Sequence, residues 1–287
     1  MTKAKKLRAV IASNDILMIP GAYDAWSARL VEMAGFQSVY MTGYGVSASV
    51  LGKPDIGLLT MSEMVTAARN MNFAVDIPVI ADADTGYGSS LNVLRTISEY
   101  EAAGIAGIQI EDQIFPKRCG HMEDKQLVSG EDMVSKIRAA VYARKDPNTI
   151  IIARTDARAV NGLEDAIKRA KSYADAGADV LFVEAPQSKE EVREIGKALQ
   201  GVPLMANMAE GGKTPPMKKD ELIELGYKIV IYPSMAIYTV TKALRENYNL
   251  LMKEGTNEPC LQYAVGWDEF HHYIGLDEMR NLEKSFK

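Results

Sequence analysis

Eight short apolar runs alternate with segments of helical spacing, and this alternation restricts the fold more than any other feature of the sequence. The runs are almost continuously apolar, as expected for strands that are buried on both faces. Strands that alternate with helices imply right-handed crossovers and a parallel sheet. The predicted strands are residues 16–20, 38–42, 78–81, 107–110, 149–153, 180–183, 203–206 and 228–232.

Helices are expected between most of these runs, and several of them end at a glycine. Gly35, Gly104 and Gly177 stand where a residue in the left-handed region commonly terminates a helix. Eight strand–helix units in 287 residues predict an α/β fold, specifically a TIM-type (β/α)8 barrel. The predicted helices are residues 25–34, 61–75, 91–103, 131–143, 163–176, 189–199 and 235–253.

The segment after Gly255 breaks this rhythm. Its apolar residues, among them Leu261, Phe270 and Leu282, recur at a loosely helical spacing. We therefore expect one barrel domain, residues 1–287, of which residues 256–287 form a C-terminal helical arm. The pattern leaves open whether this arm packs on its own barrel or on a neighbouring subunit.

Charge and cysteine content exclude several classes of protein. Lys plus Arg total 33 against 38 Asp plus Glu, and no basic block is present, which disfavours binding to nucleic acid or to anionic membranes. No apolar run approaches the roughly 20 residues of a membrane span, and no signal-peptide core follows the start. Two cysteines, Cys119 and Cys260, cannot build a disulfide framework. We expect a cytoplasmic protein.

Polar side chains stand at the end of almost every predicted strand. Reactive groups of such barrels lie at the C-terminal ends of the strands. Six consecutive strands end in this way, which predicts an active site at that end of the barrel. The residues concerned are Thr42 and Gly43, Asp82 and Asp84, Glu111 and Asp112, Arg154 and Asp156, Glu184, and Asn207.

The carboxylates among them predict a metal site. Asp82 and Asp84 are two residues apart, so in an extended chain they point to the same side and repel each other unless a cation compensates. Asp55 and Glu111 are further carboxylates on the same face of the barrel. Oxygen ligands without a converging His or Cys favour Mg²⁺, or Mn²⁺, over zinc. The alternative, that Asp82 and Asp84 cap the next helix, is weaker because Ser89 or Ser90 is better placed for that cap.

A second candidate is the run Lys117-Arg118-Cys119-Gly120-His121 after the fourth strand. A cysteine beside two cations and a histidine should have a depressed pKa and more thiolate character. The glycine lets the loop bend, and a long connection between strand and helix suits a mobile lid. Cys119 could donate a proton to a carbanion or attack a carbonyl, and the residues alone do not decide between these roles.

The glycine-containing run at residues 42–48 matches a loose dinucleotide-binding pattern, which we reject. A helix should open inside that motif, whereas Gly52, Pro54 and Gly57 follow and predict a long loop. We expect the exposed backbone N–H groups here to hold a substrate carboxylate or oxyanion instead.

The remaining strand-end groups predict a small anionic substrate that carries carboxylates. Arg154 is shaped to bind a carboxylate through two hydrogen bonds, and Asn207 can bind a second one. Glu184 can orient Arg154 or hold a water on the metal. The predicted substrate-binding residues are Tyr40, Thr42, Gly43, Tyr44, Arg154, Glu184 and Asn207.

At these residues the sequence resembles the isocitrate lyase/phosphoenolpyruvate mutase superfamily nearly end to end, starting at residues 20–25. The most specific motif is residues 117–121, which resemble the lyase catalytic loop. Supporting matches are the runs at residues 51–55, 82–86, 110–113, 153–157 and 207–215.

The resemblance implies a (β/α)8 barrel whose last helix is swapped between subunits, usually in a homotetramer. It implies Mg²⁺ near Asp82, Asp84 and Glu111, and near Asp55 through water. It also implies that Cys119 acts as a general acid on a gating loop, with Lys117, Arg118 and His121 beside it among the catalytic residues. The implied reaction cleaves a carbon–carbon bond of a 2-hydroxy diacid.

Within the superfamily, Tyr44 and the run at residues 207–215 look most like the group of 2,3-dimethylmalate lyase and the petal death protein. We therefore expect a substrate similar to 2,3-dimethylmalate or 2-methylisocitrate. Carboxyvinyl-carboxyphosphonate phosphorylmutases share much of the same pattern, and oxaloacetate hydrolases use similar residues, so both activities stay as alternatives. A non-catalytic binding protein on the same scaffold is disfavoured by the intact acidic set.

Overall fold

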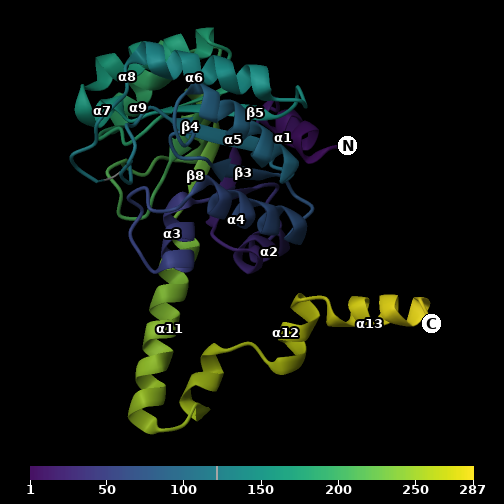
Figure 1. Cartoon of the computed structure of the whole chain (residues 1–287). Helices are drawn as coiled ribbons and strands as arrows, with labels where there is room; N and C mark the ends of the chain where they lie inside the picture. The colour runs from purple at the N-terminus through teal and green to yellow at the C-terminus, as the bar shows by residue number, and fades with distance from the viewer. Residues whose placement is uncertain (121) are drawn as a thin grey trace. The chain divides into compact units, whose positions relative to one another are not determined.

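A closed barrel of eight parallel strands forms the centre of the computed structural model, which describes residues 1–120 and 122–287 (Figure 1). Each strand pairs with the next along the chain, and the eighth pairs with the first, for example Leu17 with Ile229. All eight predicted strands are confirmed within two residues at each end. They are β1 Leu17–Ala22, β2 Val39–Met41, β3 Val79–Asp82, β4 Gly107–Glu111, β5 Ile150–Thr155, β6 Val180–Val183, β7 Leu204–Asn207 and β8 Tyr227–Tyr232.

The helices between the strands lie around the outside of this barrel (Figure 1). Each of the seven predicted helices is confirmed, and Gly35, Gly104 and Gly177 have the positive φ angles expected after a helix end. The helical elements are α1 Lys3–Ile11, α2 Ala25–Met33, α3 Gly43–Leu51, α4 Met61–Ala74, α5 Ser90–Ala102, α6 Gly130–Ala143, α7 Ala157–Val160, α8 Leu163–Asp175, α9 Lys189–Ala198, α10 Lys219–Glu224, α11 Met235–Glu254, the 3₁₀ helix η1 Glu258–Tyr263, α12 Trp267–Tyr273 and α13 Leu276–Ser285.

Helix α8 illustrates why these segments pack on the barrel as helices. Its buried residues Ala166, Ile167, Ala170 and Tyr173 recur at spacings of three and four, which places them on one face. Acidic residues occupy its first turn, where they interact favourably with the positive end of the helix dipole. The apolar face joins the core between the strands and the outer helices.

Helix α1 closes the N-terminal end of the barrel with apolar side chains. Leu7 is fully buried in a cluster with Ile19 and Ile152 from the strands. Its side chain also lies against Gly107, where a Cβ would come within 3.2 Å of it. This end of the barrel is therefore filled by an apolar core. The polar residues at the strand ends lie at the opposite, C-terminal end.

The long loop predicted after residue 42 is wrong, because residues 43–51 form helix α3. Thr42 is its N-cap and accepts a hydrogen bond from the backbone N–H of Gly45 at 3.4 Å. Gly52 ends the helix in the left-handed conformation, so the glycine that indicated a loop is a helix terminator. The closed barrel itself, rather than the absence of a helix, rules out the open dinucleotide-binding sheet.

The chain separates into two compact units, Met1–Ile237 and Tyr238–Lys287. The first unit contains the barrel. The second contains most of α11 and all of η1, α12 and α13, so it begins before the predicted start of the arm at residue 256. In the described part of the chain, no helix is both long and apolar enough to cross a membrane.

Candidate active site

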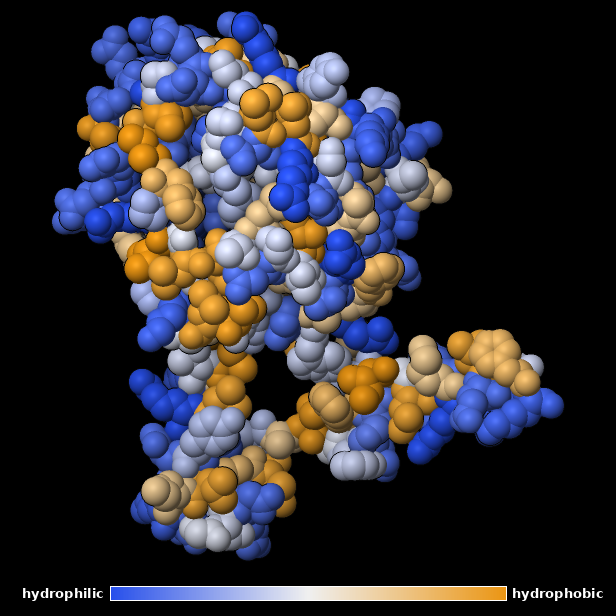
Figure 2. All heavy atoms as spheres, in the orientation of Figure 1, coloured by the Kyte–Doolittle hydropathy of each residue, from blue (hydrophilic) through white to orange (hydrophobic). Residues whose placement is uncertain are grey.

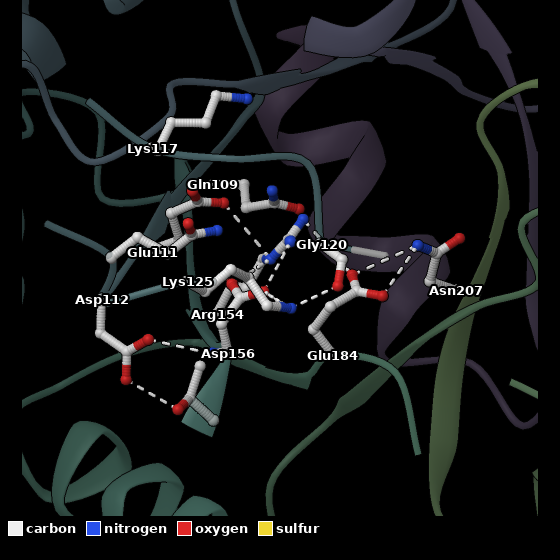
Figure 3. Close-up of polar contacts among 12 residues, drawn as sticks. Gln109, Glu111, Asp112, Lys117, Gly120, Lys125, Arg154, Asp156, Glu184 and Asn207 are labelled. Carbon is white, nitrogen blue, oxygen red and sulfur yellow. Dashed lines mark hydrogen bonds and ion pairs between the residues drawn. The ribbon is translucent and has the colours of Figure 1, made fainter. Parts of the chain in front are cut away.

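The polar residues predicted from the strand ends gather at the C-terminal end of the barrel. Figure 3 shows Glu111, Arg154, Glu184 and Asn207 directed toward one another from four consecutive strands. Together with Asp82 and Asp84 they are all buried, although each is charged or strongly polar. Burial of so many charges requires that they compensate one another.

Arg154 is the positive centre of one half of this site. Its guanidinium lies 3.3 Å from a carboxylate oxygen of Glu111, 2.9 Å from Asp156 and 3.3 Å from Glu184, and it stacks over the ring of Phe182 at 5.2 Å. Burial lowers the pKa of Arg154, but the three carboxylates outweigh burial and hold that pKa well above its usual range. In the structure, Arg154 therefore binds carboxylates of its own chain. The sequence predicted it only as a group that binds a carboxylate of the substrate.

Glu184 and Asn207 form a pair beside Arg154. The side-chain amide of Asn207 donates to both carboxylate oxygens of Glu184, at 3.3 and 3.2 Å. Glu184 thus binds Arg154 on one side and Asn207 on the other, which matches the orienting role expected for it. The amide group of Asn207 is held by a carboxylate of the protein itself.

Lys117 is the positive centre of the other half. Its ammonium lies 2.6 Å from Asp55 and 2.8 Å from Asp84, and its side chain is 3% exposed. Burial lowers the pKa of Lys117, but the surrounding carboxylates outweigh burial and raise that pKa well above its usual range. Burial also raises the pKa of Asp84 to about 6, against the opposing effect of Lys117.

Asp82 connects this cluster to the barrel interior. It accepts a hydrogen bond from the backbone N–H of Asp84 at 3.0 Å and another from the side-chain amide of Gln109 at 3.4 Å. The hydroxyl of Tyr40 donates to Gln109 at 3.1 Å. Tyr40 is buried, and burial raises the pKa of its hydroxyl well above the usual range. The structure therefore places Tyr40 inside the barrel, where it contacts Gln109.

The carboxylate set fits a hard divalent cation in its chemistry. Glu111 is almost fully buried, its Oε1 has no hydrogen-bond partner, and burial raises its pKa well above the usual range despite Arg154. Such an atom gains a partner if a cation binds there. Among the described residues, however, no three Asp, Glu, His or Cys side chains already converge at ligand distance. Lys117 stands between Asp55 and Asp84 instead, so ligation requires its ammonium to move.

Residues 117–120, which we call the cysteine loop, lie against this cluster. The backbone N–H of Cys119 donates to the carbonyl of Asp55 at 3.1 Å, and the cysteine is half-buried. The side-chain amide of Gln113 forms two hydrogen bonds with the backbone of Arg118, at 2.9 and 2.8 Å. Arg118 is exposed. The structure therefore brings Lys117 and Cys119 to the site but leaves Arg118 facing solvent. His121, also predicted to be catalytic, lies outside the described residues.

The N-terminus of α3 borders Asp82. A Cβ on Gly43 would lie 2.8 Å from a carboxylate oxygen of Asp82, so only glycine allows this approach without a shift. A helix N-terminus presents backbone N–H donors and the positive end of its dipole, and the use of this run to hold a substrate anion stays a prediction. Thr42 is buried as the cap, and Tyr44 is half-buried.

Sequence reasoning named Asp112 as a strand-end residue without giving it a role, and it missed Lys125. Asp112 accepts hydrogen bonds from the backbone N–H of Asp156 and from the hydroxyls of Thr155 and Tyr173, at 2.9, 2.7 and 2.8 Å. Its position at a strand end was a usable signal. Lys125 is buried beside the site, although a lysine in a polar segment ordinarily predicts exposure.

Removal of the Arg154 charge should destabilise the protein strongly. Arg154→Met leaves Glu111, Asp156 and Glu184 buried without their main cation, for which we expect a loss of about 3–5 kcal/mol. Arg158→Met is a matched control, because Arg158 pairs with Glu191 at 2.5 Å but both side chains are 20% exposed. That change should cost about 1 kcal/mol or less. Urea denaturation followed by circular dichroism measures both, and equal losses would contradict the assigned role of Arg154.

Comparison with known proteins gives one consistent family. The model of the phosphoenolpyruvate phosphomutase family matches residues 7–252. The chain is 47% identical to 2,3-dimethylmalate lyase of Eubacterium barkeri, over 100% of this chain and 99% of that protein. It is 46% identical to a 2-methylisocitrate lyase of Aeropyrum pernix, with 98% and 91% covered. It is 44% identical to the chloroplastic carboxyvinyl-carboxyphosphonate phosphorylmutase of Arabidopsis thaliana, with 98% and 84% covered.

Solved structures agree with this result. A crystal structure of 2,3-dimethylmalate lyase superposes with a TM-score of 0.94 at 39% identity, covering 99% of this chain and 95% of that one. Oxaloacetate acetylhydrolase with the inhibitor 3,3-difluorooxalacetate gives 0.93 at 34% identity, covering 99% and 97%. Phosphonopyruvate hydrolase in complex with oxalate and Mg²⁺ gives 0.90 at 32% identity, covering 99% of both chains. The protein therefore belongs to the phosphoenolpyruvate phosphomutase family, within the isocitrate lyase/phosphoenolpyruvate mutase superfamily.

Proposed function

We propose that this protein is a magnesium-dependent carbon–carbon lyase. In this proposal it cleaves a 2-hydroxy diacid similar to 2,3-dimethylmalate or 2-methylisocitrate into a 2-keto acid and a carboxylic acid. The observation that carries the proposal is the backbone hydrogen bond from Cys119 to Asp55, because it holds the cysteine next to a residue of the buried carboxylate set. The relatives named 2,3-dimethylmalate lyase and 2-methylisocitrate lyase support the same class of reaction.

Asp82, Asp84 and Glu111 would hold the Mg²⁺ ion, with Asp55 bound through water. All four are buried oxygen donors, and Glu111 has an oxygen without a hydrogen-bond partner. When bound, the ion would supply a positive charge that polarises the hydroxyl and carboxylate oxygens of the substrate. The phosphonopyruvate hydrolase complex, which contains Mg²⁺, supports this choice. Mn²⁺ prefers similar ligands and should substitute for it.

The chain's own residues would bind and orient the diacid. Arg154 and Lys117 offset the negative charge that the substrate brings into a site already rich in carboxylates. The N–H groups at the start of α3, next to Gly43, can bind one substrate carboxylate. The amide of Asn207 can bind the other, provided that it shares its hydrogen bonds with Glu184. Tyr44, half-buried at the same helix start, would border the substrate.

The bond cleavage then requires one proton to leave and one to arrive. The 2-hydroxyl gives its proton to a carboxylate of the site and becomes the carbonyl of the keto acid as the bond between C2 and C3 breaks. The electron pair of that bond moves to the departing carboxylic acid, which becomes an enediolate. The thiol of Cys119 donates its proton to the carbon of this enediolate, completing the carboxylic acid. Closure of the loop, expected from the sequence, would exclude water, which otherwise competes as the proton donor.

Replacement of the general acid should remove most of the activity. For Cys119→Ser we expect kcat to fall by about 10²–10⁴-fold, because a serine hydroxyl is a much weaker acid than a thiol. Cys260→Ser is the matched control and should keep full activity, since Cys260 lies in the C-terminal unit. Keto-acid release coupled to a dehydrogenase measures both variants. Unchanged turnover in Cys119→Ser would rule out the general-acid role.

A substrate panel with Mg²⁺ tests the reaction class. We expect free keto acid from 2,3-dimethylmalate or 2-methylisocitrate. Release of oxalate and acetate from oxaloacetate alone would point to a hydrolase, as the oxaloacetate acetylhydrolase structures suggest. A new phosphorus–carbon bond seen by phosphorus NMR would point to the mutase activity of the Arabidopsis thaliana relative. Either of these results would replace the lyase proposal.

Magnesium should stabilise the folded protein more at pH 7.5 than at pH 5. The pKa of Asp84 is raised to about 6 in the folded protein. Ionisation of this carboxyl therefore lowers the free energy of unfolding as pH rises toward and through 6, and a bound cation offsets this loss of stability. At pH 5 most of Asp84 is protonated and binds metal poorly. Thermal denaturation with and without Mg²⁺ measures the difference. Asp84→Asn should abolish the stabilisation, whereas Glu190→Gln, a change at an exposed carboxylate, should retain it.

We also propose that the C-terminal unit packs on other copies of this chain in a homotetramer. In residues 238–287, all of which the structure describes, no apolar side chain is buried. Figure 2 shows many hydrophobic residues on the surface of this unit. Trp267 and Phe286 are each 78% exposed, an unfavourable state for side chains of this size. A helical arm exchanged between subunits would bury them.

Cytoplasmic location stays a prediction from composition.

Light scattering during gel filtration tests this assembly. We expect four times the chain mass of 31.5 kDa. The double change Trp267→Asp with Phe286→Asp should shift the protein to smaller species, because it places charges in an apolar interface. Glu283→Lys is the control: Glu283 is an exposed residue of α13 that pairs with Lys287, and this change should leave the assembly intact. A monomeric wild-type protein would refute the proposal.

A further inference from the structure

Lys125 is a buried lysine that lies beyond the cysteine loop and has two partners. Its side chain is 1% exposed, and its ammonium donates to the backbone carbonyl of Gly120 and, at 2.9 Å, to the carboxylate of Asp156. Figure 3 shows the lysine between these two groups. One partner belongs to the loop and the other follows strand β5, so this side chain joins the loop to the barrel.

The barrel side of this connection is rigid. Asp156 is completely buried and accepts two hydrogen bonds from Arg154, at 2.9 and 3.1 Å. Its backbone N–H donates to Asp112 at 2.9 Å. Arg154 and Lys125 hold the pKa of Asp156 below its usual range, although burial alone would raise it. The carboxylate is therefore a fixed, negatively charged anchor.

The loop side is seated directly on the site. A Cβ on Gly120 would lie 2.2 Å from a guanidinium nitrogen of Arg154 and 2.8 Å from the side chain of Glu184. The backbone of Gly120 thus lies close against Arg154 and Glu184. Cys119 is the preceding residue, so any displacement of Gly120 also displaces the thiol.

We propose that Lys125 is a positioning residue, which holds Gly120 against the barrel through Asp156 and thereby keeps the preceding residue, Cys119, in place beside Asp55. Its effect on turnover rests on the proposed lyase function, but its effect on the position of the loop does not. Lys125 acts through the loop backbone, and its ammonium is directed to Gly120 and Asp156. A displaced general acid lowers turnover more than it lowers substrate binding.

Alkylation of Cys119 by iodoacetamide, read by peptide mass spectrometry, tests the position of the loop without any substrate. In Lys125→Met we expect Cys119 to react several-fold faster than in the wild type, because the loop opens more often. Cys260 is the internal reference in the same sample and should react at an unchanged rate. In the same variant kcat should fall by about 10²-fold with a smaller change in KM.

Lys136→Met is the matched control for the loss of a buried ammonium. Lys136 is buried on α6, and its ammonium donates to the carbonyl of Thr85 at 2.9 Å, in the connection after β3 rather than in the loop of Cys119. Lys125→Arg keeps the charge beside Asp156 and should bring the alkylation rate back toward that of the wild type. If Lys125→Met does not fold, Lys125→Gln replaces it, since its shorter side chain is polar but reaches the two partners less well.

The outcomes separate the two proposals. An alkylation rate of Cys119 in the Lys125 variant no greater than in Lys136→Met would overturn the positioning role. So would a faster reaction of Cys119 and Cys260 together, since it indicates general loosening of the fold. If Cys119 alone reacts faster but the wild-type enzyme cleaves no 2-hydroxy diacid, the loop inference holds and the proposed lyase function fails.

Discussion

The compensation of buried charge at one end of the barrel is the interaction on which the rest of the site depends. Asp55, Asp84 and Glu111 are buried carboxylates, and burying charged groups of one sign together is costly unless cations lie beside them. Lys117 and Arg154 provide those cations, and each is held by more than one carboxylate. This arrangement makes the site costly to disturb, and it also prepares the site for a divalent ion and an anionic substrate.

The barrel makes such a concentration of charge possible. Parallel strands bring their C-terminal ends to one rim, so residues far apart in sequence meet there. Helix α1 fills the opposite end with Leu7 and other apolar side chains, which supplies a core that offsets the cost of the polar end. Helix α3 begins directly at the rim, where Gly43 allows its N-terminus to approach Asp82.

The cysteine loop connects this static charge network to chemistry. Three contacts hold this loop: the ion pair of Lys117 with Asp55, the backbone hydrogen bond from Cys119 to Asp55, and the hydrogen bond from Lys125 to Gly120. Lys125 is in turn fixed to the barrel by its buried ion pair with Asp156. A reacting thiol must be placed within a fraction of an ångström, and several independent contacts achieve that better than one.

The sequence by itself determined the barrel and most of the site, because apolar periodicity and polar strand ends are local patterns that the fold uses directly. Asp82, Asp84, Glu111 and Arg154 were identifiable for that reason. Only the tertiary structure decided which charges pair: that Arg154 binds Glu111, Asp156 and Glu184, and that Lys117 stands between Asp55 and Asp84. The structure also showed that residues 43–51, expected as a loop, form α3 on the local cap of Thr42. It buried Lys125 because Asp156, at the end of β5, is brought beside it, a contact that local sequence does not reveal.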